Sequence, residues 1–559
     1  MEKIFRIFSK ESVNINQAAV LLGLFTLLSQ VLALFRDRSI AHFIGPSSSL
    51  DAYYAAFRVP DLIFVCIASL ASVTVLIPFI SAKMQGGKVT QEAEKFLGDV
   101  FTVFFGGMVF VAVIFFFLMP HLIFFIAPGF PPALQKVAID LSRIMLLSPI
   151  LMGLSNLFGT ITQLFNRFFV FSLSPVFYNL GIIIGVIFLY PIFGIYGLTF
   201  GVIIGALMHF GIQAFASHSC GFTPKFSLSI NFADMKKVAM TSLPRTLGLA
   251  FNNAAEISMT AFASFLAAGS ISIFNFSYNL QSVPLSIFGI SYAVAAFPTL
   301  ARSVSLGNHD HFNNHLKSAA RSIVFWSIPA TFLFIVLRAQ IVRVILGSGF
   351  FSWNDTRLAA AALAIFSVSV LAQGMTALIS RAYYAKGDTK TPLVINFICS
   401  VLIIVFAYLF LKIFENIQFF RYFMESLLKI DDISGTEVIM LPLAYSLGTI
   451  LNFILHWIFV KRDFMPNEPF IAKVFFQSLG ASFFLGISTY LSLNLLSPIF
   501  DTTTFFGIFL QGFISGIIGI IVAIIVLYLL QNEELKSLLE TLKTKFWRAK
   551  IIASSQEEL

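Results

Sequence analysis

Apolar runs of about twenty residues follow one another along almost the whole chain, and short loops separate them. Hydrophobic residues make up 58% of the 559-residue sequence and charged residues only 11%, against about 25% charged in an average soluble protein. A run of this length matches the hydrocarbon thickness of a bilayer, in which a helix satisfies its own backbone hydrogen bonds. The sequence therefore predicts an all-α protein that crosses a membrane many times.

The apolar segments and the charges of the loops between them predict how many helices cross the membrane and in which direction. With the N-terminus in the cytoplasm, most Lys and Arg residues fall in loops on that side, as the positive-inside rule requires. We therefore expect a multi-pass protein with about 14 transmembrane helices and both termini in the cytoplasm. The predicted spans are 17–43, 52–81, 97–126, 137–165, 170–190, 193–216, 237–267, 271–301, 319–346, 357–385, 391–413, 438–460, 471–496 and 504–530.

Composition and motifs exclude several classes of function. The net charge of +9 is spread over loops, which indicates anionic lipid rather than nucleic acid as a partner. His309, His311 and His315 lie close in sequence, but their spacing matches no zinc site. The chain has no GxxxxGK loop, HExxH motif or nucleophile elbow. We expect no catalytic residue, metal or cofactor, and a transporter driven by the membrane potential or an ion gradient.

The chain also repeats itself at a nearly constant interval. Val59-Pro60 is matched by Val283-Pro284, Gly129-Phe130 by Gly349-Phe350, and Pro175-xxx-Asn179 by Pro392-xxx-Asn396, with offsets of 217 to 224 residues. Six spans followed by six spans with the same loop sidedness predict two parallel, pseudo-symmetric repeats. This pattern is typical of a transporter whose two lobes rock around a central cavity.

The repeat sets the predicted domains. We expect an N-lobe over 1–225 and a C-lobe over 226–465. Spans thirteen and fourteen, in 466–531, lie outside the repeat. The tail 532–559 mixes charge with Leu at helical spacing, which predicts a cytoplasmic amphipathic helix.

Ionisable and polar residues inside predicted spans are costly in a bilayer, so each is a candidate functional group. In span 237–267, for example, one helix face carries three of them at i, i+7 and i+11. Similar stripes lie in the first, second and eighth spans, which begin the two repeats. The predicted substrate-binding residues are Arg36, Asp37, Arg38, Asp51, Arg58, Asp61, Arg245, Asn252, Glu256, Asn275 and Asn279.

Two interpretations of these groups stay open. Arg58 and Asp61 lie at i and i+3, so they either form a structural ion pair or serve the substrate. Arg245 has no acidic residue one turn away, which favours a role in holding an anion or facing water. The Asn and Ser stripe of span 271–301 serves either the substrate or helix packing.

Prolines recur inside the spans. Pro60 and Pro284 remove a backbone hydrogen bond at corresponding positions of the two repeats and bend their helices. A single proline bend is as readily a static kink as a hinge. Their repetition in both halves favours hinges for lobe movement.

Six stretches resemble a known family. They are FRDRSIAHFIG (35–45), LDAYYAAFRVPDL (50–62), IAPGF (126–130), FASFLAAGSISIFNFSYNLQSVP (262–284), GISYAVAAFPTLARS (289–303) and GDTKTPLVIN (387–396). In these stretches the chain resembles the MviN/MurJ lipid II flippases, within the superfamily that also holds multidrug and polysaccharide exporters. The resemblance covers nearly all of residues 15–460.

The resemblance implies a bacterial inner-membrane flippase, expected as a monomer. Its substrate would be lipid II, an undecaprenyl pyrophosphate that carries a disaccharide–pentapeptide. A cationic central cavity would hold the headgroup, and a groove lined by spans thirteen and fourteen would hold the isoprenoid tail. Guanidinium groups would replace the water around the diphosphate, and alternating access would carry the headgroup outward.

Residue by residue, the resemblance assigns the family's Arg-Asp pair to Arg36 and Asp37, its acidic partner to Asp51 and a basic residue to Arg58. The chain departs from the family at four positions. It has Gln30, Phe64 and Asn279 where relatives often have Arg, and Met259 where many carry an Asp linked to a cation site. The hypothesis is that Arg245 and Arg38 restore positive charge to the cavity. Glu256 is the candidate to replace the missing Asp of the cation site. Coupling to a monovalent cation stays open.

Four other functions compete with this one. The first is a flippase for another polyprenyl-linked oligosaccharide. A drug or organic-cation antiporter would favour an acidic cavity, whereas the candidate residues here are neutral to basic. A non-transporting scaffold is the third. A membrane glycosyltransferase or ligase would carry a large outer loop with acidic and His residues, and the loop 414–437 is modest and has no His.

Overall fold

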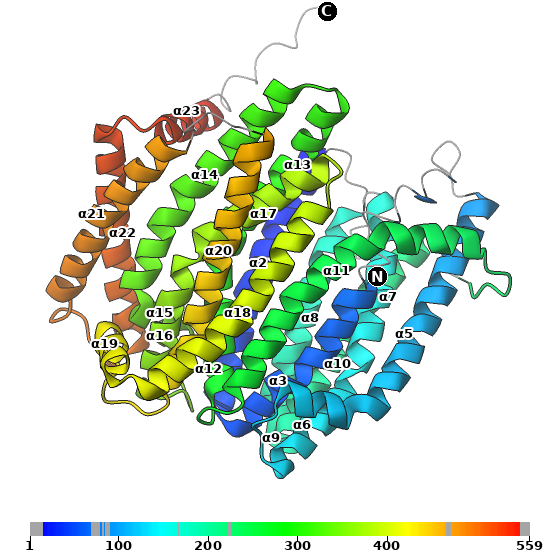
Figure 1. Cartoon of the computed structure of the whole chain (residues 1–559), viewed down its shortest axis with the longest axis horizontal. Coiled ribbons are helices and arrows are strands. Elements are labelled where there is room, and N and C mark those ends of the chain that lie inside the picture. Colours follow the sequence, from blue (N-terminus) through cyan, green and yellow to red (C-terminus); the bar gives the residue numbers. More distant parts are fainter. Residues whose placement is uncertain are drawn as a thin grey trace, which may run out of the picture. The chain divides into compact units, whose positions relative to one another are not determined.

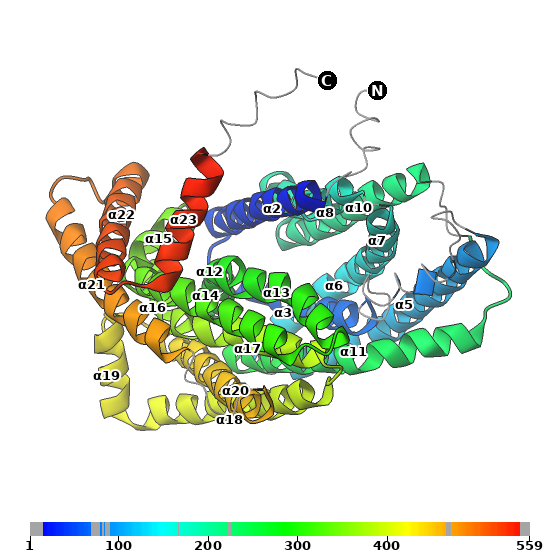
Figure 2. The same ribbon diagram turned by 90° about the horizontal axis from the view of Figure 1, so that it is seen from above.

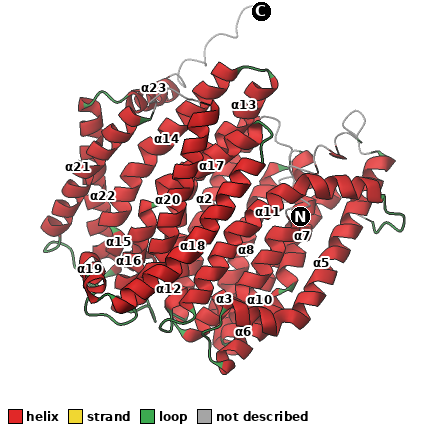
Figure 3. Ribbon diagram, viewed as in Figure 1, coloured by secondary structure: helices red, strands yellow, loops and turns green. Residues whose placement is uncertain are grey.

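The computed structural model describes residues 15–68, 76, 79–80, 83, 90–165, 167–220, 225–464 and 471–547. Within these ranges it describes side chains from residue 23 to 540, apart from 67–68, 241, 243–245, 247–249 and 252. All regular elements of the described residues are helices (Figure 3), which confirms the all-α class.

Figure 1 labels the described helices along the chain. In chain order they are α2 (Ile15–Phe43), α3 (Ser48–Ile63), η1 (Phe64–Ala68), α5 (Gln91–Ile126), α6 (Pro132–Met145), α7 (Leu147–Leu164), α8 (Phe168–Ile184), η2 (Gly185–Leu189), α9 (Tyr190–Phe193), α10 (Ile195–Ser219), α11 (Phe232–Ala263), α12 (Ser270–Pro284), η3 (Leu285–Ile290), α13 (Ser291–Ser305), α14 (His309–Val336), α15 (Arg338–Ile345), α16 (Trp353–Val368), α17 (Val370–Ala385), α18 (Lys390–Asn416), α19 (Gln418–Leu428), η4 (Thr436–Ile439), α20 (Met440–Phe464), α21 (Ala472–Leu496), α22 (Phe505–Leu529) and α23 (Glu533–Trp547).

Ten helices, or eleven if the bent pair α16 and α17 counts as one span, are long and apolar enough to cross a membrane among the described residues. These correspond to eleven of the predicted spans and confirm a multi-pass membrane protein. The other three predicted spans, 17–43, 52–81 and 237–267, each include residues or side chains outside the described part. The count of 14 therefore stays a prediction.

Contacts divide the chain into two compact units. The first comprises Met1–Phe276, Ile345–Ala359 and Thr389–Tyr445, and the second comprises the ranges between them together with the C-terminal part from Ser446. This division differs from the predicted lobes 1–225 and 226–465, because α11 and α18 pack within the first unit. The lobes, the segment 466–531 and the tail 532–559 stay predictions.

Small residues bring helices of the first unit close together. α10 packs against α7 and α8, and α2 lies beside α8 (Figure 2). A Cβ on Gly181 would collide with the Gly205 backbone, and one on Gly185 with Gly201. Such glycines let helix backbones touch in a bilayer, where no hydrophobic force drives helices together.

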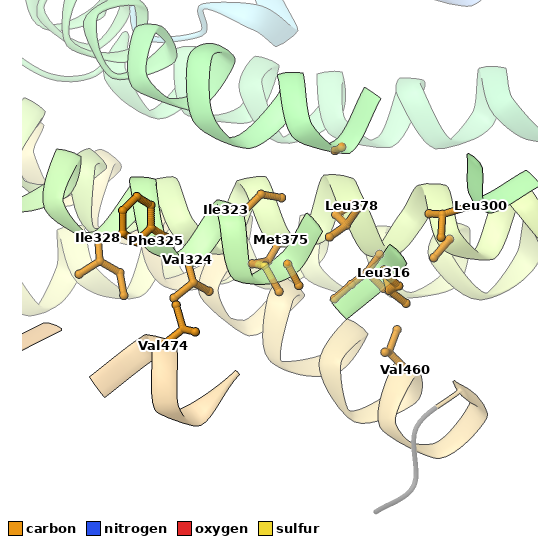
Figure 4. Close-up of a cluster of buried hydrophobic side chains, with 14 of the residues drawn as sticks. Leu300, Leu316, Ile323, Val324, Phe325, Ile328, Met375, Leu378, Val460 and Val474 are labelled. Atoms are coloured by element: carbon orange, nitrogen blue, oxygen red, sulfur yellow. The ribbon is translucent and has the colours of Figure 1, made fainter. Parts of the chain in front are cut away.

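The second unit has a continuous apolar core. It gathers side chains from α13, α14, α17, α20, α21, α22 and α23. Figure 4 shows Ile323 and Val324 of α14 beside Met375 and Leu378 of α17. This core joins the two C-terminal spans to the helices that precede them.

One local feature recurs at the repeat interval. A π-helix follows Pro60 as η1 and Pro284 as η3, so each predicted hinge proline precedes a local widening of its helix. The shared feature supports the internal repeat, whereas the hinge role itself stays a prediction.

Helix α23 is held against its own unit by ion pairs. Glu533 bonds Lys473 at 2.8 Å and Arg321 at 2.5 Å, and Glu534 bonds Arg321 at 2.5 Å. The side chain of Asn532 caps the helix by accepting from Leu535 N at 3.0 Å. The predicted amphipathic tail therefore begins as a docked helix.

The Glu533 contacts predict a pH-dependent stability. Hydrogen bonds from Lys473 and Arg321, together with their charges, lower the pKa of Glu533 to about 2. A carboxyl whose pKa falls on folding stabilises the native state above its ordinary pKa of about 4.3 and loses that contribution as pH falls toward 2. We expect Glu533→Gln to lower the melting temperature in detergent at pH 7, and the difference from wild type to vanish between about pH 4.3 and 2.

A double-mutant cycle with Lys473→Met is the control. If the ion pair carries the effect, Glu533→Gln costs less stability in the Lys473→Met background than in wild type. An effect of Glu533→Gln that is constant from pH 7 to 3 would contradict the assignment.

Candidate substrate site

Arg58 is the centre of a polar cluster in the first unit. Its helix α3 begins at the cap residue Ser47, whose hydroxyl accepts from Leu50 N at 3.4 Å. The Arg58 guanidinium donates from Nη1 to Glu256 Oε2 at 2.9 Å and from Nε to Thr260 Oγ1 at 2.9 Å. Nη2 donates to Asn275 Oδ1 at 3.0 Å. Arg58 thus joins α3 to α11 and α12.

The partner of Arg58 tests the predicted Arg58–Asp61 bridge, while its substrate role stays a prediction. Among the described residues its ion pair is with Glu256, at 2.9 Å, and not with Asp61 one turn away. The hypothesis of an Arg58–Asp61 bridge is therefore wrong. The i, i+3 spacing permits that bridge, but carboxylate and amide groups of two neighbouring helices satisfy the guanidinium fork instead.

Arg36 forms a second cluster on α2. Its Nε and Nη2 donate to Asp37 Oδ1 at 2.9 and 2.7 Å, and Nη1 donates to Asn179 Oδ1 at 3.1 Å. Asn179 on α8 in turn donates to Ser29 Oγ at 3.2 Å. Asp37 is only 2% exposed, whereas the Arg36 side chain is 21% exposed. The guanidinium is held in place and still reaches the surface.

Both arginines are neutralised by a carboxylate in this structure. The expectation of a cationic lining therefore needs a correction for Arg36 and Arg58: each is one half of an ion pair, with Asp37 and Glu256 respectively. A buried charge left unpaired would carry a desolvation cost of several kcal/mol, which explains the pairing. An anion would have to compete with these carboxylates or share the guanidinium with them.

Asp51 lies apart from the two clusters and binds a helix end. Its carboxylate accepts from Gly269 N at 2.7 Å, Ser272 N at 2.8 Å and Ser272 Oγ at 2.6 Å. It is 3% exposed. Asp51 therefore supplies the N-cap of α12 from another helix, and the positive end of the helix dipole favours its charge. Gly269 has a φ of 90°, and a Cβ there would lie 2.9 Å from Pro46 Cβ.

The other predicted residues are placed separately. Arg38 points to the end of α15, where Nη1 donates to Ile345 O at 3.3 Å. Asn279 belongs to the second unit, whereas the clusters belong to the first. The side chains of Arg245 and Asn252 lie outside the described part, although both residues belong to α11.

Three further residues complete the clusters and were not predicted. Asn179 holds Arg36, Thr260 holds Arg58, and Ser272 holds Asp51. Asn179 was noted only as part of a repeated Pro-xxx-Asn pattern, and Thr260 lies one turn beyond Glu256 on the same helix face. The sequence shows both patterns, but only the packing of the helices shows that Asn179 accepts from Arg36 and Thr260 from Arg58.

Tyr54 lies on the same helix as Arg58. Its hydroxyl is buried and has no hydrogen-bond partner within the described part of the chain. Its ring meets Phe276 edge-on at 6.1 Å between centroids. A phenol donor and two guanidinium groups on one pair of helices can bind an anion with several oxygens.

Comparison with known proteins gives a family. The sequence model of the family described as "Lipid II flippase MurJ" matches residues 40–511. A curated relative from Buchnera aphidicola subsp. Baizongia pistaciae, named "Probable lipid II flippase MurJ", is 25% identical over 417 residues, covering 73% of this chain and 80% of the relative.

Solved structures show the same fold. A "Lipid II flippase MurJ, inward closed conformation" superposes with a TM-score of 0.72 at 22% identity, over 93% of this chain and 100% of that one. An inward-facing multidrug transporter of the MATE family, in the MOP superfamily, superposes with a TM-score of 0.64 at 14% identity, over 80% of this chain and 98% of that one.

Proposed function

Since residues 40–511 match the lipid II flippase MurJ family, this chain belongs to that family, and we propose that it moves lipid II from the inner to the outer leaflet of the bacterial cytoplasmic membrane. The match over these residues carries the proposal. Its curated relatives are named lipid II flippases. No bond of the substrate is made or broken in this function, so the chain acts as a transporter and not as an enzyme.

The paired arginines suit a diphosphate that must be bound and then released. A diphosphate cannot enter a bilayer with its charge uncompensated, because burial of an unpaired ion is prohibitive. Arg36 and Arg58 are already desolvated and oriented by Asp37, Asn179, Glu256 and other partners. In the proposed cycle the phosphate oxygens replace a carboxylate on one guanidinium, and the carboxylate returns when the headgroup leaves.

The remaining parts of the proposal follow from the sequence. Both termini lie in the cytoplasm and a single copy is the working unit. The isoprenoid tail stays in lipid beside spans thirteen and fourteen, α21 and α22, while the headgroup crosses by alternating access. The driving force is the membrane potential or a monovalent cation gradient, since the chain carries no ATP-binding loop of the GxxxxGK type.

Depletion with complementation tests the function. In a host whose own flippase is depleted, we expect lipid II to accumulate on the inner leaflet and wild-type chain to restore it to the outer leaflet. Arg36→Ala should fail, and Arg245→Ala tests the side chain that the structure does not describe. Arg462→Ala, which removes a 66% exposed side chain, is the matched control and should rescue. Failure of the wild-type chain at normal expression would contradict the function.

A further inference from the structure

Helix α19 presents an apolar face away from the protein. Phe419 is 81% exposed, Tyr422 62% and Leu427 60%, and Phe423 is also exposed. These residues lie at i, i+3, i+4 and i+8, so they share one side of the helix, together with Ser426. Met424, Glu425 and Leu428 on the opposite side are buried. In a water-exposed helix the outer face would be the charged one.

The helix is fixed in this orientation. Glu425 accepts from Thr436 Oγ1 at 2.6 Å and from Arg421 Nε at 3.0 Å. Arg357, at the start of α16, donates to Lys429 O at 3.1 Å and pairs with Asp432, which also lowers the pKa of that exposed carboxyl. These bonds fix both the helix and the loop after it, so the apolar face of α19 has a defined orientation.

A connection between α18 and α20 does not require α19. In the first repeat the corresponding connection, between the fifth and sixth spans, is made by the four-residue helix α9 and Gly194. In the second repeat it takes residues 417–439, which include α19 and η4. The extra residues therefore serve something other than closure of the connection.

The apolar face continues a surface that already meets lipid. α18 is a predicted and observed span of 27 residues, about 40 Å long. Its exposed apolar side chains run toward its C-terminal end, and α19 begins two residues after that end, crossing the direction of α18 (Figure 2). The exposed apolar side chains of α18 are Val394, Phe397, Ile398, Val401, Val405, Tyr408 and Leu409.

We propose that α19 is an interfacial anchor whose Phe419, Tyr422, Phe423 and Leu427 insert into the outer leaflet. Orientation follows from the loop charges, which place residues 414–437 outside. Aromatic side chains with a polar rim are typical of the membrane–water interface, and an amphipathic helix there buries its apolar face by about 5–10 Å. The exposed face of Phe419, Tyr422, Phe423, Ser426 and Leu427 carries no charged side chain, which favours acyl chains over a charged protein partner.

Site-directed spin labelling tests the anchor. The three cysteines form no disulfide with one another, so a background with Cys66→Ser, Cys220→Ser and Cys399→Ala leaves one introduced thiol. Labels at Phe419→Cys and Phe423→Cys are compared with Gln418→Cys, an exposed position on the polar side of the same helix. The protein is reconstituted in vesicles of phosphatidylethanolamine and phosphatidylglycerol.

The proposal predicts opposite accessibilities. Labels at 419 and 423 should collide several-fold more often with oxygen than with a water-soluble nickel chelate, and the label at 418 should show the reverse. Equal access of the nickel chelate to all three positions would overturn the proposal. Protection of 419 and 423 from both reagents would also overturn it, since a second copy or a protein partner would then cover the face.

Because Cys substitution at exposed positions can still disturb packing, the Thr436–Glu425 contact gives an independent measurement. Thr436→Val removes the hydrogen bond that holds the buried side of α19. In vesicles the label at 423 should then keep its lipid exposure while its mobility rises. Loss of lipid exposure in this variant would show that the protein and not the membrane positions the face.

Discussion

Arg58→Ala is expected to lower lipid II transport by about 10-fold or more and to destabilise the protein. The substitution removes a guanidinium with three hydrogen bonds and takes the Arg58 charge away from the half-buried Glu256. Loss of one partner of a buried pair costs about 3–5 kcal/mol; since the Glu256 side chain is 27% exposed, the lower end of that range applies. Loss of charge-assisted bonds to the diphosphate should lower transport by about 10- to 100-fold or more.

The double variant Arg58→Ala/Glu256→Ala separates structure from binding. Removing both partners also removes the carboxylate that has lost Arg58, so thermal stability should recover toward wild type. Transport should not recover, because the diphosphate has lost a ligand. If transport recovers together with thermal stability in the double variant, Arg58 only holds α3 to α11. The proposed contact between Arg58 and the substrate would then be wrong.

Much of the fold follows from the sequence because the bilayer imposes it. An apolar run of the right length must be a helix there, so eleven of the predicted spans correspond to observed helices. The sequence also pointed to a shared local geometry at Pro60 and Pro284, each of which is followed by a π-helix. Both the length of an apolar run and the effect of a proline act within one helix, so they can be predicted without knowing how the helices pack.

Partners across helices could not be predicted in the same way. Asp61 lies one turn from Arg58 and is the partner that local spacing offers, yet Glu256, 198 positions away, takes the guanidinium. Asp51 was assigned to the substrate because it lies at the start of a polar stripe, but it caps α12. Which group a side chain meets depends on how helices pack, and helical periodicity fixes only the face from which it starts.

Asp51→Asn is expected to favour the outward-open state. Asp51 lies in the predicted N-lobe, and the α12 terminus that it caps lies in the predicted C-lobe, on the outer side of the membrane in the proposed orientation. An outward opening that separates these segments must break all three hydrogen bonds. An amide keeps the size of the side chain but loses the charge that strengthens them and favours the helix dipole. The loss is about 2–3 kcal/mol, or roughly 30- to 150-fold in the ratio of the two states.

Spin-label distances measure this shift. Labels at Ser48→Cys and Ala268→Cys, both exposed near the capped terminus, report the separation in a cysteine-free background. Asp51→Asn should raise the longer-distance population, and Ser272→Ala, which removes one of the three bonds, should shift it in the same direction by less. Because a transporter held open on one side cycles slowly, the Asn variant should also transport lipid II more slowly. Unchanged distances in a folded Asp51→Asn variant would mean that the cap stabilises α12 in both states and does not act as a gate.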